Sequence, residues 1–215
     1  MSVFSKFFHA FNTAQPGWQF MWIILIFGAV MLAIALERAI FIYVRSNVSA
    51  SRFMAKIREL VLKDNYDKAI ELCRSAGQKA LPLVVLAAVK EAKGRDFIDF
   101  RAVQNAVDEA TLEIIPKLSK RTGYLAVIGN IATLTGLLGT IFGLIVSFEA
   151  AGAAGAGQEA LTQGIAVAML TTMWGLLVAI PSLIAYTVIN TKANDIVDDI
   201  DEHSVKLIHL MTRGK

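Results

Sequence analysis

The segment AVAMLTTMWGLLVAIPSLIAY, residues Ala166 to Tyr186, lies within a run from Ala160 to Thr191 that has no charged side chain. A helix crosses a bilayer core about 30 Å thick with about 20 apolar residues, so this run is long enough to span a membrane. Two further apolar runs, Trp18 to Val44 and Thr122 to Phe148, are also long enough. The composition agrees, because 55% of the residues are hydrophobic and only 18% are charged. We therefore predict an all-α membrane protein with three transmembrane helices.

Basic side chains are distributed unevenly around these runs. On one side lie Arg38, Arg45, Arg52, Lys117, Lys120, Arg121 and Lys192, and on the other lie Lys6, Glu149 and Glu159. Loops rich in Lys and Arg stay in the cytoplasm, so we predict an outer N-terminus and a cytoplasmic C-terminus. The predicted order is an outer N-terminal segment (1–17), a first span (18–44), a cytoplasmic helical domain (45–121), a second span (122–148), an outer loop (149–159), a third span (160–191) and a cytoplasmic tail (192–215).

The predicted cytoplasmic domain has helical periodicity interrupted by helix breakers. We expect Asp64 to cap one helix and Gly77 and Gly94 to end two others. After Gly94 the apolar spacing continues into the second span, which predicts one long helix kinked at Pro116. The third span is likewise expected to extend into the cytoplasm. Cys73, the single cysteine, is expected to be a buried structural thiol.

Small and hydroxyl side chains recur at helical spacing in the last two spans. In the second span they are Thr133, Gly136, Thr140, Gly143 and Ser147, with Gly139 completing a GxxxG pattern. In the third span they are Gly164, Ala168, Thr171 or Thr172, Gly175, Ala179 and Ser182. Such stripes allow close helix packing in lipid. Packing and pore lining are both open interpretations for the glycines.

Three threonines favour an ion pathway. Thr140, Thr171 and Thr172 are expected near mid-membrane, where hydroxyl groups can bind a cation or water on a cavity wall. Pro181 frees a backbone carbonyl, which is tolerated at that depth only inside protein or beside a wet cavity. Neither span contains Asp, Glu, Lys, Arg or His. A group that takes up and releases an ion must therefore come from another chain.

Other chemistry is sparse in this sequence. Glu37 and Arg38, near the inner end of the first span, are expected to extend toward the membrane interface. His9, His203 and His209 are too scattered for a metal site. No nucleotide-binding loop, nucleophile triad or nucleic-acid signature is found. We predict no enzymatic activity, no metal and no cofactor, and contact with membrane lipids but not with nucleic acid.

Two long motifs resemble the channel helices of the MotA/TolQ/ExbB family. They are IGNIATLTGLLGTIFGLIVSF (Ile128–Phe148) and QGIAVAMLTTMWGLLVAIPSLIAY (Gln163–Tyr186), and EIIPKL (Glu113–Leu118) precedes them. The resemblance implies a subunit of the bacterial inner membrane that converts an ion gradient into mechanical work, with its outer parts in the periplasm. It implies a ring of five copies around two copies of a single-span partner of the ExbD, TolR or MotB type. A membrane aspartate of that partner carries the ion, and Thr140 and Thr172 line the pore opposite it.

One departure from the pattern concerns the transported ion. ExbB and TolQ proteins usually have glutamate where this chain has Val167 and alanine where it has Thr171, so the segment is more similar to sodium-driven flagellar stators. The transported ion is therefore H⁺ or Na⁺, with Na⁺ favoured by the adjacent Thr171 and Thr172. The alternative function is a passive membrane scaffold of an envelope complex, in which the small-residue stripes only pack helices.

Overall fold

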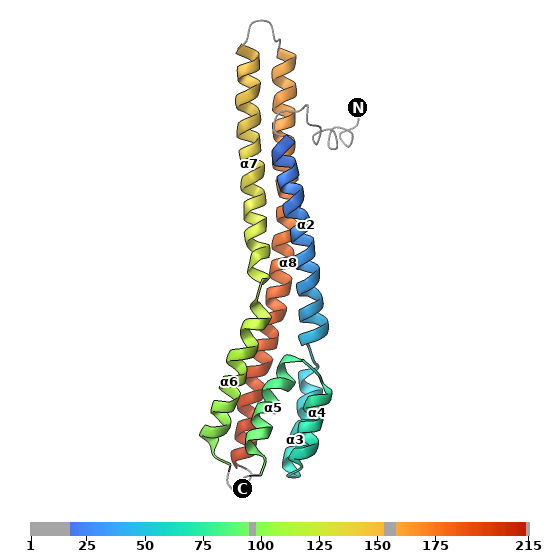
Figure 1. Ribbon diagram of the computed structural model, residues 1–215, viewed down its shortest axis with the longest axis vertical. Coiled ribbons are helices and arrows are strands. Elements are labelled where there is room, and N and C mark those ends of the chain that lie inside the picture. The colour runs from blue at the N-terminus through green and yellow to red at the C-terminus, as the bar shows by residue number, and fades with distance from the viewer. Residues whose placement is uncertain (1–17, 95–97, 153–157, 214–215) are drawn as a thin grey trace. The chain divides into compact units, whose positions relative to one another are not determined.

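The computed structural model describes residues 18–94, 98–152 and 158–213, and every regular element in these ranges is a helix (Figure 1). In chain order these are α2 (Trp18–Ile40), the π-helix η1 (Phe41–Ser46), α3 (Ala50–Leu62), α4 (Tyr66–Ser75), α5 (Ala80–Ala92), α6 (Phe100–Ser119), α7 (Thr122–Gly152) and α8 (Gln158–Arg213). Three helical stretches, within residues 18–62, 100–152 and 164–212, are long and apolar enough to cross a membrane. This confirms the prediction of an all-helical chain with three long apolar helices. The predicted N-terminal segment, residues 1–17, lies outside the described residues.

The helices belong to two compact units. The first unit combines the described residues up to Leu36 with Arg121–Thr187. The second combines Glu37–Lys120 with the described residues from Val188 onward. Both α2 and α8 contribute to the two units, because each helix runs across a unit boundary.

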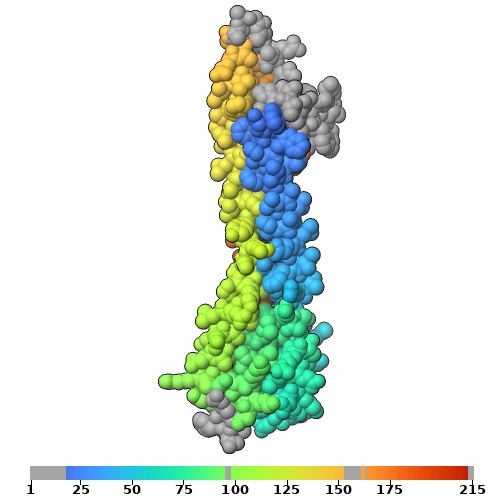
Figure 2. Space-filling view, in the orientation of Figure 1, coloured from blue at the N-terminus to red at the C-terminus, as the bar shows by residue number. Residues whose placement is uncertain are grey.

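The first unit consists of α7 and α8 as an antiparallel hairpin, with α2 packed against it (Figure 1). Its small core contains Ile24, Ala132 and Val178, and Trp174 packs on this cluster. In the space-filling view, the N-terminal part of α2 lies directly beside α7 (Figure 2). Large apolar side chains such as Leu134, Ile145 and Ile180 are exposed on the outside of the unit. Such a surface suits lipid, where a buried core is not what holds helices together.

The second unit is built around α5, whose residues are almost all apolar. Eight of its thirteen residues are buried, namely Ala80, Leu81, Pro82, Val84, Val85, Ala88, Val89 and Ala92. A helix that is apolar on most faces needs neighbours on most sides. Its neighbours include α4 and α6, and α4 in turn packs against α3, which buries Phe53, Ile57 and Val61 at a spacing of four residues. The C-terminal part of α8 buries Ile196, Ile200, Leu207 and Ile208 within the same unit.

The junction of α3 and α4 differs from the predicted cap by one residue. Asn65 caps α4, because its side chain accepts a hydrogen bond from the Lys68 backbone N–H at 3.3 Å. Asp64 has a φ of 51° and its N–H donates to the Val61 carbonyl at 3.0 Å. Asp64 therefore closes α3 instead of opening α4, and the predicted cap was wrong. Gly77 and Gly94 follow α4 and α5 with φ of 73° and 78°, as expected of residues that end helices.

The predicted long helix through Pro116 is interrupted. Pro116 lies inside α6, which ends at Ser119. Lys120 has a ψ of 132° and Arg121 a φ of 65°, and α7 begins at Thr122. The prediction of one continuous second helix was therefore wrong, because two residues outside the helical region are enough to break a helix without changing its apolar spacing. In contrast, α8 continues without a break to Arg213, so the predicted extension of the third helix is present.

Cys73 provides a test of the packing of the second unit. Its side chain is buried on α4, and burial raises the pKa of the thiol to about 12. Since the thiolate is the reactive form, only about one thiol in ten thousand is ionised at pH 8. We predict that Cys73 is unreactive toward a thiol reagent at pH 8 in the folded protein and reacts rapidly after denaturation. Rapid labelling without denaturation would contradict this packing.

Candidate functional site

Four glycines allow the backbones of α7 and α8 to approach closely. A methyl group on Gly136 would lie 2.9 Å from the Thr171 carbonyl oxygen, and one on Gly175 would lie 2.6 Å from the Ala132 carbonyl oxygen. At Gly143 the methyl would lie 2.9 Å from the Ala168 Cβ. A methyl group on Gly139 would lie 2.9 Å from Thr171 Oγ1 and 3.2 Å from the Phe20 Cβ of α2. Packing within one copy of the chain therefore requires all four glycines.

Three hydroxyl groups meet where these glycines bring the helices together. Thr140 on α7 has its Oγ1 3.1 Å from the Gly136 carbonyl oxygen and 3.2 Å from that of Ala168 on α8. It also forms a hydrogen bond with the hydroxyl of Thr172. The Thr171 and Thr140 hydroxyls lie 3.5 Å apart. The structure thus brings together Thr140, Thr171 and Thr172, which the sequence singled out.

The two adjacent threonines occupy different environments. Thr171 is only 1% exposed, and its hydroxyl donates to the carbonyl oxygens of Ala168 at 2.6 Å and Gly136 at 3.1 Å. Thr172 is partly exposed, and its hydroxyl lies 3.2 Å from the same Gly136 oxygen. Adjacent residues on a helix point about 100° apart, which accounts for this difference. Thr171 therefore joins the two helices, whereas Thr140 and Thr172 lie at the edge of the contact.

Three further positions that the sequence singled out, Thr133, Ser147 and Pro181, lie outside the hydroxyl cluster. Thr133 donates to the Gly129 carbonyl of its own helix at 3.1 Å, and Ser147 donates to the Gly143 carbonyl at 2.6 Å. Ser147 is buried and faces Gly164 on α8. Pro181 is exposed inside α8, so its side chain is not part of the α7–α8 contact.

Ser182, which follows Pro181 on α8, forms a second bond between the two helices. Its side chain is fully buried, and its hydroxyl donates to the Leu125 carbonyl of α7 at 2.6 Å. A buried hydroxyl group without such a partner would be costly. The hairpin is therefore fixed by hydroxyl–carbonyl bonds at two levels, near Thr171 and near Ser182.

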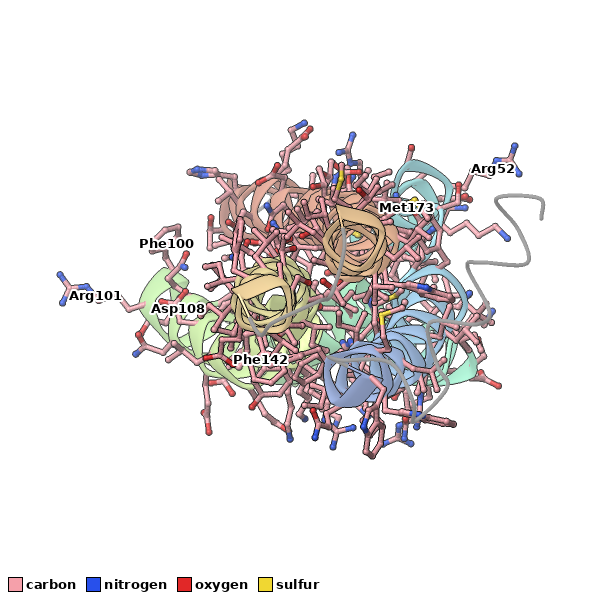
Figure 3. The ribbon with its side chains drawn as sticks, turned by 90° about the horizontal axis from the view of Figure 1, so that it is seen from above. Arg52, Phe100, Arg101, Asp108, Phe142 and Met173 are labelled. Carbon is pink, nitrogen blue, oxygen red and sulfur yellow. The ribbon has the colours of Figure 1, made fainter. Side chains whose placement is uncertain are left out.

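The hairpin has two flanks, and α2 covers one of them. Phe142 of α7 stacks on Phe20 of α2 with ring centroids 5.6 Å apart, and Figure 3 shows Phe142 on this side. Trp174 of α8 packs on the cluster that contains Ile24 of α2. Each of these aromatic residues follows a threonine, Thr140 or Thr172, by two positions, which is about 200° around a helix. The Thr140–Thr172 pair is therefore on the flank away from α2.

Arg38 lies in the second unit, and its position corrects the prediction that it extends to the interface. Its side chain is only 4% exposed. Its Nη2 donates to the carbonyl oxygens of Lys117 and Leu118 at 3.1 Å each, and its guanidinium lies 4.5 Å from the Phe41 ring centroid. The last carbonyls of a helix have no partner within the helix and carry partial negative charge. Arg38 therefore caps the C-terminal end of α6.

The described residues offer no group of three or more His, Cys, Asp and Glu side chains that could hold a metal ion. The runs 122–148 and 160–191 also lack ionisable side chains in the sequence. The chemical groups of the hairpin are therefore hydroxyls, amides and backbone carbonyls. These groups can bind water or a cation, but they do not exchange protons near neutral pH.

This arrangement is a pair of uncharged helices joined by a hydroxyl cluster. The model of the MotA/TolQ/ExbB proton channel family matches residues 77–202, which include the whole cluster. The chain belongs to this family. The match confirms the resemblance that the two long motifs indicated.

Similar proteins agree with membership of the MotA/TolQ/ExbB family. A putative biopolymer transport protein ExbB homolog of Methanothermobacter thermautotrophicus is 29% identical over 78% of this chain and 58% of its own length. The Tol-Pal system protein TolQ of Haemophilus influenzae is 32% identical over 54% of this chain and 52% of its own length. The chain thus spans little more than half the length of these two relatives. A solved structure of C. jejuni MotAB has a TM-score of 0.61 with 18% identity, covering 86% of this chain and 70% of that one, which shows a shared fold.

The region matched to the MotA/TolQ/ExbB family begins at residue 77, so it does not include Arg38. Sequence analysis missed this residue because an arginine at the end of an apolar helix usually extends to the interface. The helix end that it caps is more than seventy residues away in the sequence. No local pattern connects the two positions.

The glycine contacts predict the effect of adding one methyl group. Gly136→Ala and Gly175→Ala place Cβ against a backbone carbonyl that cannot move aside, so each should destabilise the protein by about 1–3 kcal/mol. Gly123→Ala is the matched control on α7, because a methyl there meets nothing within 4 Å and alanine favours the helix. Thermal unfolding in detergent measures all three variants. Equal melting temperatures for Gly136→Ala and Gly123→Ala would contradict the close contact.

Arg38→Met should leave two helix-terminal carbonyls of α6 without a charged donor. We predict a loss of about 2 kcal/mol or more in the free energy of unfolding. Arg45→Met is the control, because Arg45 is exposed and its Nε donates to the Gln78 side chain at 3.1 Å. That change should cost less than about 0.5 kcal/mol. A melting temperature for Arg38→Met no lower than that of Arg45→Met would disprove the capping role.

Proposed function

We propose that the chain is the channel subunit of a complex that uses an ion gradient across the bacterial inner membrane to drive a periplasmic or outer-membrane partner. The observation that carries this proposal is the Thr140–Thr172 hydrogen-bonded pair, which lies on the flank of the hairpin away from α2. Both residues are only partly buried, and an accessible hydroxyl can exchange its hydrogen bond for one with water or a carboxylate on a wet path. Membership of the MotA/TolQ/ExbB proton channel family supports the same function.

The complex has the composition that the family resemblance implies. We propose a ring of five copies, with the Thr140–Thr172 flank inward, around two copies of a single-span subunit of the ExbD, TolR or MotB type. The absence of ionisable residues from runs 122–148 and 160–191 supports such a partner, because a membrane aspartate must then be supplied by another chain. The N-terminus is periplasmic, residues 45–121 and 192–215 are cytoplasmic, and the loop 149–159 is periplasmic.

The threonine pair acts on the carboxylate of the partner. A hydroxyl of Thr140 or Thr172 donates a hydrogen bond to the carboxylate while it is ionised, and this favours the charged form. When the carboxyl group is protonated, that bond is weaker and the partner helix is released from the pair. Uptake and release of the ion are thereby linked to attachment and detachment of the partner helix. The chain itself needs no cofactor and catalyses no bond cleavage.

Protons are the ion that the geometry favours. The preference for sodium depended on Thr171 and Thr172 both contributing oxygens to one cation. The Thr171 hydroxyl is buried and engaged with the Gly136 and Ala168 carbonyls, so it is not available on the open flank. A proton moves along water and requires few ligands from the wall, which the remaining Thr140–Thr172 pair satisfies.

Removal of one hydroxyl tests this function. We predict that Thr140→Val or Thr172→Val lowers proton flux about ten- to one-hundred-fold, because a hydrogen bond to a charged group contributes about 1.5–3 kcal/mol. Thr187→Val is the control, because the Thr187 hydroxyl donates only to the Leu183 carbonyl of its own helix, at 2.9 Å. The measurement is dye-detected proton flux in vesicles that contain the chain and its co-purified single-span partner.

Two other outcomes of this experiment are informative. Unchanged flux in both threonine variants would favour the passive scaffold, in which the hydroxyls only pack helices. Flux that stops when sodium is removed at fixed pH would return sodium as the transported ion. In each case the melting temperature of the variant shows whether a loss of flux comes from unfolding.

A further inference from the structure

Asn130 is a polar residue on an exposed face of α7. It is exposed, although its neighbours Ile131 and Leu134 are apolar and also exposed. It follows the first residue of α7 by eight positions, which is about 12 Å along a helix. An amide at that depth is unfavourable in lipid unless water or another polar group satisfies it.

The position of Asn130 relates it to the threonine pair. Asn130, Thr133, Leu137 and Thr140 are separated by three, four and three residues, so they follow one side of the helix. Gly129 and Gly136, which pack against α8, lie on another side. Phe142, which stacks on α2, is about 120° from Asn130 around the helix. Asn130 thus lies on the side of α7 that neither α2 nor α8 covers.

The residues of α8 that lie beside Asn130 and Thr140 show how far apart these two residues are along the helix pair. Its neighbour Gly129 contacts Ala179 and Leu183, whereas Thr140 contacts Ala168 and Thr172. Ten residues separate Asn130 from Thr140, which is about 15 Å of helix. Under the proposed topology, Asn130 is therefore between the threonine pair and the cytoplasm.

We propose that Asn130 forms a second polar binding site of the ion path. Its carboxamide binds water or hydronium on the cytoplasmic side of the threonine pair. This inference rests on the proposed function of the chain. The carboxamide has one acceptor oxygen and two N–H donors, so it can order water in either direction without adding charge. Thr133, one turn closer to Thr140, continues the same polar side. A proton released at the threonine level has a hydrated route past Leu137 toward the cytoplasm.

Cysteine accessibility tests this site directly. The single native cysteine is first removed by Cys73→Ala, and Asn130→Cys is then introduced into the full chain with its partner in inside-out vesicles. The probe is a positively charged methanethiosulfonate, which reacts with thiolate in water and not with a thiol in lipid. Ile26→Cys is the matched control, because Ile26 is 58% exposed and lies about 200° around α2 from Gly28, which contacts Val178 at the depth of Gly129.

We expect labelling at Asn130→Cys to be at least about tenfold faster than at Ile26→Cys. Thr133→Cys should also label faster than the control, and it carries the test if Asn130→Cys does not fold. Equal rates, or slower labelling at both polar positions, would show that this side faces lipid or a neighbouring copy and would overturn the proposal.

A flux measurement separates this inference from the proposed function. Asn130→Leu should lower proton flux, and Asn130→Gln, which keeps the carboxamide, should restore most of it. Slow labelling at positions 130 and 133, with flux still sensitive to Thr140→Val, would reject the Asn130 site alone. Rapid labelling with no effect of Thr140→Val or Thr172→Val would reject the proposed function and leave a wet surface at Asn130.

Discussion

The backbone contact between α7 and α8 is the constraint on which the rest of the first unit depends. In lipid, no hydrophobic free energy is gained when one apolar helix is buried against another, so association depends on close packing and hydrogen bonds. Gly136 and Gly175 lie so close together that a single added methyl group would meet the opposite backbone. This closeness brings the carbonyls of Gly136 and Ala168 within reach of hydroxyls from both helices. Glycine packing and the hydroxyl cluster are therefore two aspects of one contact.

The contact between α7 and α8 also gives the three threonines different roles, one in packing and two at the accessible edge. Thr171 has its hydroxyl satisfied by two carbonyls within the protein, and this makes it part of the packing. Thr140 and Thr172 bond to each other at the edge of the contact and are only partly buried. A polar group that is satisfied but still accessible can exchange partners when another helix approaches. The packing and ion-path interpretations of the sequence thus apply to different residues of the same cluster.

Much of this arrangement could be predicted from the sequence because it repeats with the period of a helix. The apolar runs give the three long helices, and the spacing of Gly136, Thr140 and Gly143 gives the face of α7 that meets α8. Features that depend on one or two residues could not be predicted this way. The positive φ of Arg121 interrupts the helix between α6 and α7. The cap of α4 is Asn65, one position after the predicted Asp64.

Helical periodicity also does not predict contacts between residues that are far apart in the sequence. Arg38 binds carbonyls at the end of α6, and no local signal in the sequence links an arginine of α2 to that helix end. The choice between Thr171 and Thr172 was equally hidden. Both are suited to bonding across helices, and only the rotation of α8 against α7 decides which hydroxyl becomes buried.

The unbroken course of α8 has a mechanical consequence. Its 56 residues form a single helix that passes through Pro181 without interruption, and it contributes to both units. A continuous helix resists bending and twisting because each turn is bonded to the next. The chain from α6 to α7 lacks that stiffness at Lys120 and Arg121, because the ψ of Lys120 (132°) and the φ of Arg121 (65°) are not helical. The helix α8 is therefore stiff along its own length, whereas any force that passes from α7 to α6 has to cross two residues with non-helical dihedral angles.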